Sequence, residues 1–322
     1  MDYTESLGHP VLRREIAQLY QQITPAQILV HAGAEEAIFN FMNEVLTPGD
    51  HLIVHTPCYQ SLFEIADANG CQVSRWQTTE SDGWALDLDF LRRNIRNNTR
   101  AIVFNCPHNP TGYMPSAEQL GQILAIAQDH HLLVFSDEVY RGLEYQPENR
   151  LPAACDLYDN AVSLGVMSKT FGLAGLRIGW IATQNQSVFN ALAEFKDYTS
   201  ICNSAPSELL AIVALQYREK IIKRNLALVQ ENLQNLTNFI NRHSDYFDWV
   251  PPKAGTVAFP WLHNHGDSEW FCADLRSRKG VLLAPGSTFD YGNSHFRIGF
   301  GRQNFAAGLA KLEEYVQENP TV

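Results

Sequence analysis

The sequence has no Cys-x-x-Cys pair, no basic stripe and no long hydrophobic run. Its cysteines are widely spaced, and most lie in apolar or strand-like segments: Cys58, Cys71, Cys106, Cys155, Cys202 and Cys272. This spacing favours buried free thiols in a reducing compartment over a zinc site or a redox motif. No stretch approaches the ~18 consecutive apolar residues of a membrane span, so we expect no membrane partner.

Positive charge is also scarce. The 322 residues include 24 Lys and Arg against 35 Asp and Glu, which gives a formal net charge of -11 at pH 7. An acidic chain without a basic stripe is not expected to bind nucleic acid. The first ten residues, MDYTESLGHP, have neither a positive start nor an apolar run. The sequence therefore predicts no signal peptide and a cytoplasmic protein.

Short apolar runs alternate with helical patterns over the first two thirds of the chain. Helical periodicity covers 34–46, 59–70 and 116–131, with Ser116 as an N-cap. The strand-like runs are 26–33, 51–57, 100–106, 132–138, 161–166 and 177–183. This alternation predicts an α/β fold in which a mostly parallel sheet lies between helices.

The pattern changes at about residue 204. A long amphipathic stretch extends to about residue 243, and the short apolar runs 256–262, 281–286 and 295–301 then alternate with helices. We therefore expect a large domain over 24–205 and a smaller C-terminal α+β domain over 206–322. Residues 1–23 are expected to form an N-terminal segment that packs with the small domain.

Four short segments lie where predicted strands end or helices begin. They are HAGAEEA (31–37), NCPHNPTG (105–112), SDEVY (136–140) and SKTFGLAGLR (168–177). In open α/β sheets, ligands bind outside the carboxyl ends of the strands. Asn109, Asp137 and Lys169 are therefore expected to meet in one crevice.

The chemistry of these residues suits pyridoxal phosphate (PLP). A lysine amine forms Schiff bases with carbonyl groups, and Lys169 lies in a turn of small residues and glycines. The ring nitrogen of PLP needs a carboxylate to stay protonated, which Asp137 can supply. Asn109 and Tyr140 can donate hydrogen bonds to the ring hydroxyl oxygen.

A phosphate group needs backbone N–H groups and a cation. The turn at 33–35 begins a predicted helix and can supply the N–H groups. Arg177 can add a forked contact from its guanidinium group. The glycines at 172, 175 and 179 do not have the dinucleotide spacing, so a Rossmann site is not expected.

With these motifs, the sequence resembles the class I/II aminotransferases, which are PLP enzymes of fold type I. The resemblance runs from Tyr3 to Arg297. Its most specific motif is Ser168-Lys169 followed by Thr-x-Gly-x-x-Gly-x-Arg, and the weaker motifs NPTG and SDEVY occur in the expected order. The resemblance implies the aminotransferase fold, PLP as cofactor, and a homodimer with its sites at the subunit interface.

The resemblance also implies catalytic roles. Lys169 forms the Schiff base, Asp137 pairs with the pyridine nitrogen, and Tyr59 stacks on the ring face. The implied cofactor-binding residues are Gly33, Ala34, Glu35, Tyr59, Asn109, Asp137, Tyr140, Ser168, Lys169 and Arg177, with Tyr3 reaching the neighbouring subunit's phosphate. Arg297 and Asn109 are expected to bind the substrate, with Arg297 on its α-carboxylate.

Three departures from the family pattern bear on the pocket. Family members usually carry several dozen residues before the position of Tyr3, so either Met1 is not the natural start or the pocket is more open. Val166 stands where a serine is common, which removes one phosphate contact. The segment 195–198, FKDY, lacks the arginine of dicarboxylate-specific members. We therefore expect substrates with neutral, large side chains, although Lys196 could accept an acidic substrate and Asp197 a basic one.

The sequence thus predicts an aminotransferase that moves an amino group between an amino acid and a 2-oxo acid through a Lys169 Schiff base. The same chemistry supports a β-lyase, a decarboxylase or an amino-acid cyclase, and these alternatives stay open. A non-catalytic cofactor-binding module is a remote alternative. No metal site is expected, because His263, His265 and Asp267 belong to a loop where such residues are usually solvated.

Overall fold

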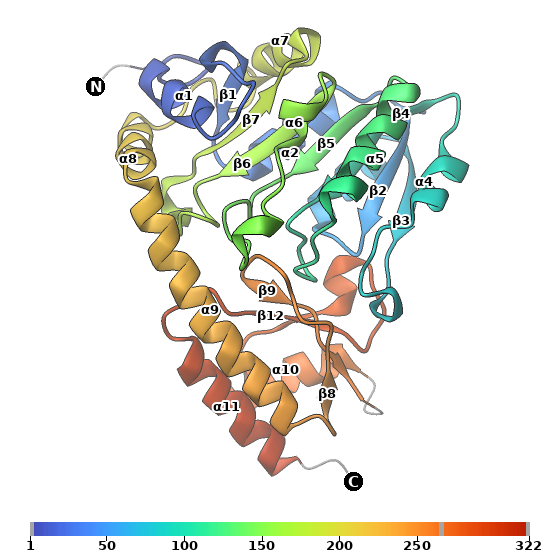
Figure 1. Cartoon of the computed structure of the whole chain (residues 1–322), viewed down its shortest axis with the longest axis vertical. Coiled ribbons are helices and arrows are strands. Elements are labelled where there is room, and N and C mark those ends of the chain that lie inside the picture. Colours follow the sequence, from blue (N-terminus) through green and yellow to red (C-terminus); the bar gives the residue numbers. More distant parts are fainter. Residues whose placement is uncertain (1–2, 264–266, 320–322) are drawn as a thin grey trace.

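The computed structural model describes residues 3–263 and 267–319, and it confirms the expected α/β fold (Figure 1). Seven strands form one sheet in the order β1-β7-β6-β5-β4-β2-β3. They are β1 Ile28–His31, β2 His51–Thr56, β3 Gln72–Gln77, β4 Thr99–Asn105, β5 Leu133–Asp137, β6 Ala161–Val166 and β7 Gly179–Thr183. Within this described sheet, β7 alone runs opposite to the other strands, so the sheet is mostly parallel, as predicted.

Helices cover both faces of the sheet and bury its apolar strands. The helices around this sheet are α1 Pro10–Ala17, α2 Ala34–Glu44, α3 Glu64–Ala68, α4 Leu88–Asn94, α5 Ala117–Asp129, α6 Ala154–Leu157, α7 Gln186–Lys196 and α8 Ala205–Gln216. One face packs against α2, α3 and α7, and the other against α4 and α5. The side chain of Ser116 caps α5 by accepting a hydrogen bond from the N–H of Gln119, as expected.

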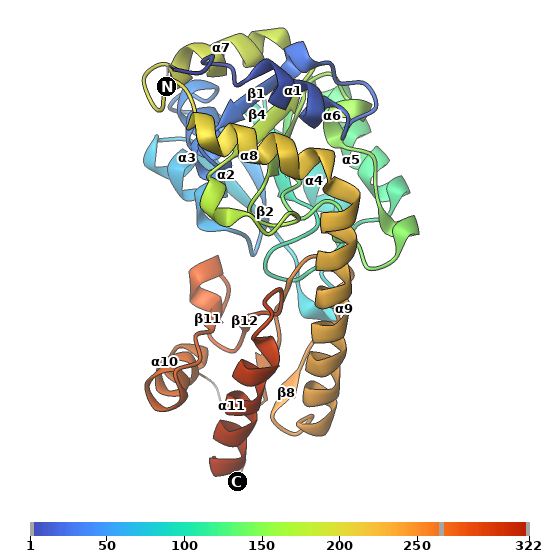
Figure 2. The same ribbon diagram turned by 90° about the vertical axis from the view of Figure 1, so that its left-hand side faces the viewer.

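The C-terminal part has its own core. Its elements are α9 Arg218–Arg242, β8 Phe247–Asp248, β9 Val257–Ala258, β10 Trp261–Leu262, α10 Ser268–Lys279, β11 Ala284–Pro285, β12 Phe296–Gly299 and α11 Phe305–Glu318. The order β11-β12-β9 forms a small antiparallel sheet. The helix α9 runs from the large domain into the small one, where it lies beside α11 (Figures 1 and 2).

Three predicted elements are divided in the structure. The helix expected at 59–70 is reduced to a turn at 60–62 and the short α3, because buried Phe63 between them has a φ of -136°, outside the helical range. The stretch 204–243 forms α8 and α9, separated at Tyr217. The run 256–262 forms β9 and β10, with Pro260, which has no N–H to donate, between them.

The N-terminal segment packs against both the large sheet and α8. Leu12 and Ile16 of α1 are fully buried in a cluster with Val30 of β1 and Ile212 of α8. Residues 1–23 are expected to pack with the small domain, and α8 belongs almost entirely to the range 206–322 assigned to that domain, so this expectation stays a prediction. Because α8 shares this cluster, the division of the chain at 205 and 206 stays a prediction.

Candidate active site

The first turn of α2 forms a small cradle beside Arg177. Gly33 precedes the helix with a φ of 95°, a conformation that glycine adopts readily. A Cβ atom at Gly33 would lie 2.7 Å from a guanidinium nitrogen of Arg177, and one at Gly179 would lie 2.7 Å from the backbone N of Ala34. Two glycines thus let the backbone and a cation approach each other at a helix N-terminus, which is a favourable place for an anion.

Asp137 ends β5 in the middle of the sheet. Its side chain is only 5% exposed, and Oδ1 accepts a hydrogen bond from the N–H of Val139 at 3.1 Å. Burial raises the pKa of Asp137 to about 7, although the Val139 N–H and the Lys169 charge act in the opposite direction. An enclosed carboxyl group of this kind gains stability from a cationic partner.

Lys169 lies in the connection between β6 and β7. Its Nζ is 5.6 Å from the ring centroid of Tyr140, which is buried. The neighbouring Thr170 donates a hydrogen bond from Oγ1 to the carbonyl of Arg141 at 2.8 Å. This bond ties the lysine turn, which begins with half-buried Ser168, to the segment after Asp137.

Asn109 and Arg297 meet between the two domains. Asn109 is buried in the loop after β4, and Arg297 is half-buried on β12 of the small domain. Arg297 donates a hydrogen bond from its guanidinium group to Oδ1 of Asn109 at 3.0 Å. The same guanidinium lies 5.0 Å from the ring centroid of Phe289.

Tyr59 lies near both Glu35 of α2 and Arg297 of the small domain. It follows β2, is 43% exposed, and has a pKa raised by partial burial and by the charge of Glu35. The charge of Arg297 acts on the same phenol in the opposite direction. Ser61 donates a hydrogen bond to Oε1 of Glu35 at 2.5 Å. Tyr59 is therefore a neighbour of both the α2 turn and the small domain.

Three predicted or alternative residues lie apart from this group. The side chain of Tyr3 is 90% exposed, so its predicted contact with a neighbouring subunit stays a prediction. Lys196 is fully buried and donates to the carbonyls of Ser6 and Ile201 at 2.7 and 3.2 Å. Since its amine is occupied by backbone carbonyls, Lys196 is not available to an acidic substrate. Asp197 accepts a hydrogen bond from Oγ of Ser6.

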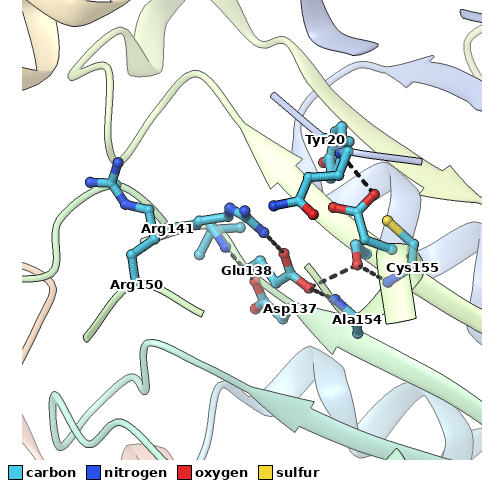
Figure 3. Close-up of polar contacts among 12 residues, drawn as sticks. Tyr20, Asp137, Glu138, Arg141, Arg150, Ala154 and Cys155 are labelled. Atoms are coloured by element: carbon cyan, nitrogen blue, oxygen red, sulfur yellow. Dashed lines mark hydrogen bonds and ion pairs between the residues drawn. The ribbon is translucent and has the colours of Figure 1, made fainter. Parts of the chain in front are cut away.

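A polar cluster lies directly behind Asp137, on the other side of the strand. The carboxylate of Glu138 accepts hydrogen bonds from Oγ of Ser163 at 2.8 Å and from the N–H of Ala154 at 2.9 Å. Its other oxygen pairs with Arg141 at 3.3 Å (Figure 3). A cavity of about 130 Å³ beside it is lined by apolar side chains and by the polar residues Tyr20, Glu138, Arg141, Arg150 and Thr170. The C-terminal end of β5 is thus held by hydrogen bonds of Asp137 on one face of the sheet and of Glu138 on the other.

The described residues include neither a cluster of metal ligands nor a helix that could span a membrane. Within 3–263 and 267–319, no group of three or more His, Cys, Asp and Glu is placed to hold a metal ion. His263 lies 3.9 Å from Asp248, and His265 is outside the described residues. Over the same ranges, no helix combines the length and apolar character needed to cross a bilayer. A cytoplasmic location stays a prediction.

Sequence reasoning missed two contributors to the site. Gly179 was not assigned a role, although its lack of a side chain lets β7 approach the α2 turn. Asn105 was not singled out either, although it is buried beside Asp137 and Asn109. Its position at the start of the NCPHNPTG segment, directly at the end of a predicted strand, was the signal that could have indicated it.

Comparison with known proteins identifies the family. Residues 1–309 match the sequence pattern of the family described as aminotransferase class I and II. The chain belongs to this family. Enzymes of the family use amino acids and 2-oxo acids, and the cofactor that the family implies for this chain is PLP, as expected.

Individual relatives have different reactions in their names. The chain is 30% identical to capreomycidine synthase of Streptomyces vinaceus over 311 residues, which are 96% of this chain and 79% of that protein. The crystal structure of a PLP-dependent aminotransferase from Streptococcus suis 89-1591 matches with a TM-score of 0.94 and 33% identity, covering 100% of this chain and 85% of that one. The PLP-dependent cyclase OrfR matches with a TM-score of 0.91 and 30% identity, covering 99% and 85%.

The residues of this chain fit PLP. Because Gly33 has no side chain, the guanidinium group of Arg177 lies close to the first turn of α2, which brings positive charge and backbone N–H groups together as a phosphate group needs. Asp137 is an enclosed carboxyl group with a raised pKa, which suits a protonated ring nitrogen. A ligand with an anion at one end and a cation in its ring matches both features.

Proposed function

We propose that the chain is a PLP-dependent aminotransferase that carries its cofactor on Lys169. The observation that supports this most strongly is the arrangement of Lys169 and Asp137. The two residues come from different strand ends, and the charge of Lys169 acts on the buried carboxyl of Asp137. PLP, when bound, withdraws electrons from the substrate α-carbon.

Each residue of the group then has a defined task. Asp137 holds a proton on the ring nitrogen of the cofactor, and Asn109 and Tyr140 donate to its ring oxygen. The N–H groups of the α2 turn, with Arg177 and Ser168, bind its phosphate. When the amino group of the substrate takes the place of Lys169, the released Nζ would be a free amine that could take the proton from the α-carbon and later return one.

Arg297 binds the α-carboxylate of the substrate. Its present partner is the neutral Oδ1 of Asn109, and a carboxylate makes a stronger, charge-assisted and bidentate contact with a guanidinium group. The bond with Arg297 uses only the acceptor Oδ1 of Asn109, so its Nδ2 can donate to the cofactor with or without the substrate.

We further infer a preference for substrates with neutral, large side chains. The segment 195–198 has no arginine, and the Lys196 amine is bonded to backbone carbonyls. A desolvated side-chain carboxylate without a cation is unfavourable, whereas burial of apolar surface stabilises the complex. Tyr59 is the best-placed aromatic wall. Phe300, three residues after Arg297, is fully buried in the small-domain core and cannot form a second wall.

A homodimer is part of the proposal. The helix α8 and the residue that follows it expose four apolar or aromatic side chains to solvent, each by more than half: Leu209, Leu210, Val213 and Tyr217. The helix lies on the outer surface of the large domain (Figure 2), and exposed apolar patches of this kind are typical of subunit interfaces. Sedimentation should detect a dimer in the unmodified chain, and Leu210→Glu should convert it to monomer. Leu282→Glu, at an exposed leucine of the small domain, is the matched control.

An amino-acid cyclase is the second candidate, because two relatives near 30% identity are a capreomycidine synthase and a PLP-dependent cyclase. The two functions differ in their need for a second substrate. An aminotransferase releases one 2-oxo acid per site from an amino-acid donor alone and then stops until another 2-oxo acid is added. A cyclase turns over continuously without a 2-oxo acid.

The half-reaction therefore tests the proposal. The purified protein with PLP is mixed with single amino-acid donors, and released 2-oxo acid, ammonia and carbon dioxide are measured. One equivalent of 2-oxo acid per site, with recovery on addition of a second 2-oxo acid, supports an aminotransferase. Continuous release of ammonia would indicate a lyase and carbon dioxide a decarboxylase, and either contradicts the proposal. Lys169→Ala is the control for cofactor-independent chemistry.

A further inference from the structure

We infer that Asn105 is a positioning residue that fixes Asp137 and Asn109 relative to each other. This inference rests on the proposed function, because Asp137 and Asn109 are the residues assigned to the cofactor ring. Asn105 is the last residue of β4 and is 1% exposed. Its amide group contacts the backbone of both residues and neither of their functional side-chain groups.

The two ends of the Asn105 amide have separate partners. Its Nδ2 donates a hydrogen bond to the backbone carbonyl of Asp137 at 2.7 Å. Its Oδ1 accepts one from the backbone N–H of Asn109 at 2.6 Å. One buried side chain therefore links the end of β5 to the loop that follows β4.

The strand register makes this link possible. Asn105 pairs directly with Asp137 in the parallel β4–β5 ladder. The next residue, Cys106, donates its N–H to the same Asp137 carbonyl at 3.0 Å. The backbone of Asp137 is thus bound on its β4 side by a side chain and by the main chain, which restricts where its carboxyl group can lie.

The link extends to the substrate side. The backbone N–H of Asn109 donates a hydrogen bond to Asn105, and the side-chain Oδ1 of Asn109 accepts one from the guanidinium group of Arg297. Movement of the Asn109 backbone would therefore move the partner of Arg297 as well. Loss of the Asn105 amide should weaken the binding of both the cofactor and the amino acid.

Two variants test the two hydrogen bonds of the Asn105 side chain separately. Asn105→Ala removes both hydrogen bonds. Asn105→Asp keeps an acceptor for the Asn109 N–H but replaces the donor to the Asp137 carbonyl with an oxygen that cannot donate when ionised. The matched control is Asn232→Ala, since Asn232 is also buried and donates to two backbone carbonyls, those of Phe300 and Arg302, within the small domain.

The experiment measures the PLP dissociation constant of the apoprotein by absorbance, the KM for one amino-acid donor, and Tm. Loss of two buried hydrogen bonds of ordinary strength should raise the PLP dissociation constant of Asn105→Ala by about 10-fold or more, with a similar rise in KM. Asn105→Asp should weaken PLP binding but keep KM within about threefold, because the Asn109 contact remains. Asn232→Ala should lower Tm without weakening PLP binding.

The outcomes are distinguishable. If Asn105→Ala loses Tm as Asn232→Ala does but binds PLP like the unmodified chain, Asn105 is only structural and the inference is overturned. If Asn105→Ala does not fold, unchanged PLP binding by Asn105→Asp overturns it in the same way. If the unmodified chain binds no PLP at Lys169, the proposed function fails, which is a different result.

Discussion

The two sides of the candidate site are built in different ways. On the large-domain side, Asp137 and Asn109 are buried at the ends of central strands, and their backbones are bonded to Asn105. On the small-domain side, Arg297 is half-buried on a four-residue strand, and its hydrogen bond crosses to the other domain. The side that we propose for the cofactor is therefore formed by the fold of the large domain, whereas the side that we propose for the substrate depends on how the domains meet.

The other contacts between the domains differ in burial, since Trp84 of the large domain packs in a buried cluster against Phe259 of the small domain, whereas the polar pairs are more exposed. Arg75 of β3 pairs with Asp290 at 3.1 Å, and these side chains are 29% and 54% exposed. Tyr291 donates a hydrogen bond to Glu80 of the large domain at 2.6 Å. Exposed polar pairs of this kind are individually weak. This difference leads to four predictions, given from the largest expected effect to the smallest.

The largest effect should follow Asp137→Asn. Loss of the charge that holds the ring nitrogen protonated should lower kcat on the order of 10²-fold or more. The stability of the apoprotein should not fall in the same way, and at high pH the substitution should raise it. Because burial raises the pKa of Asp137 to about 7, from 3.8, the stability that this carboxyl contributes is lost as the pH rises from 3.8 through 7.

The amide that replaces the Asp137 carboxyl has no charge to bury, so thermal unfolding of the apoprotein variant should show a Tm at pH 8 at or above that of the unmodified chain. The difference should shrink at pH 5, where the carboxyl is protonated in the folded state. A variant with near-normal turnover, or one destabilised equally at both pH values, would show that the carboxyl is a structural group.

The second prediction concerns the substrate side. Arg297→Gln removes a charged hydrogen-bond donor, so KM for the amino-acid donor should rise by about 10- to 100-fold. The PLP dissociation constant should change little, because the cofactor side is built without Arg297. Arg302→Gln, at an exposed arginine just after the same strand, is the matched control. Equal loss of PLP affinity in Arg297→Gln would remove the distinction between the two sides.

The third prediction compares buried histidines by acid unfolding. Burial lowers the pKa of His55 to about 3 and of His51 to about 4 in the large domain, and that of His295 to about 4 in the small domain. The folded state then binds fewer protons than the unfolded chain, so stability should be full above pH 6.5 and fall as the pH drops toward 4.

Urea unfolding at several pH values measures this dependence. His55→Gln and His295→Gln should each reduce the slope of stability against pH between 6.5 and 4 by about one proton. The large-domain variant is the sharper test, because burial alone lowers the pKa of His55, whereas the charge of Glu80, 3.6 Å from His295, acts in the opposite direction. An unchanged slope in both variants would show that other groups govern acid unfolding.

The smallest effect should come from the ion pair between Arg75 and Asp290. A double-mutant cycle with Arg75→Gln and Asp290→Asn should give a coupling free energy of about 0.2–1 kcal/mol, typical of partly exposed pairs. A coupling above about 2 kcal/mol would exceed that range and show that this side of the molecule is held more firmly than its exposure indicates.

The sequence predicted the fold because strand and helix patterns are encoded locally, whereas the roles assigned to the site residues stay predictions. Apolar runs separated by helical periods indicate the sheet, and polar residues at strand ends indicate the crevice. The break at Phe63 was not predictable in this way, since it depends on which side chains the core accepts. The role of Asn105 depends on the register between β4 and β5, and the burial of Lys196 on a contact with residue 6. Such information is absent from any local pattern.

The most direct test of the account is the attachment of the cofactor. The chain is incubated with PLP, reduced with borohydride, digested, and analysed by peptide mass spectrometry. The account predicts one pyridoxyl group per chain, on the peptide that contains Lys169, and no label in Lys169→Ala. A pyridoxyl group on a different lysine, with Lys169 unmodified, would contradict it.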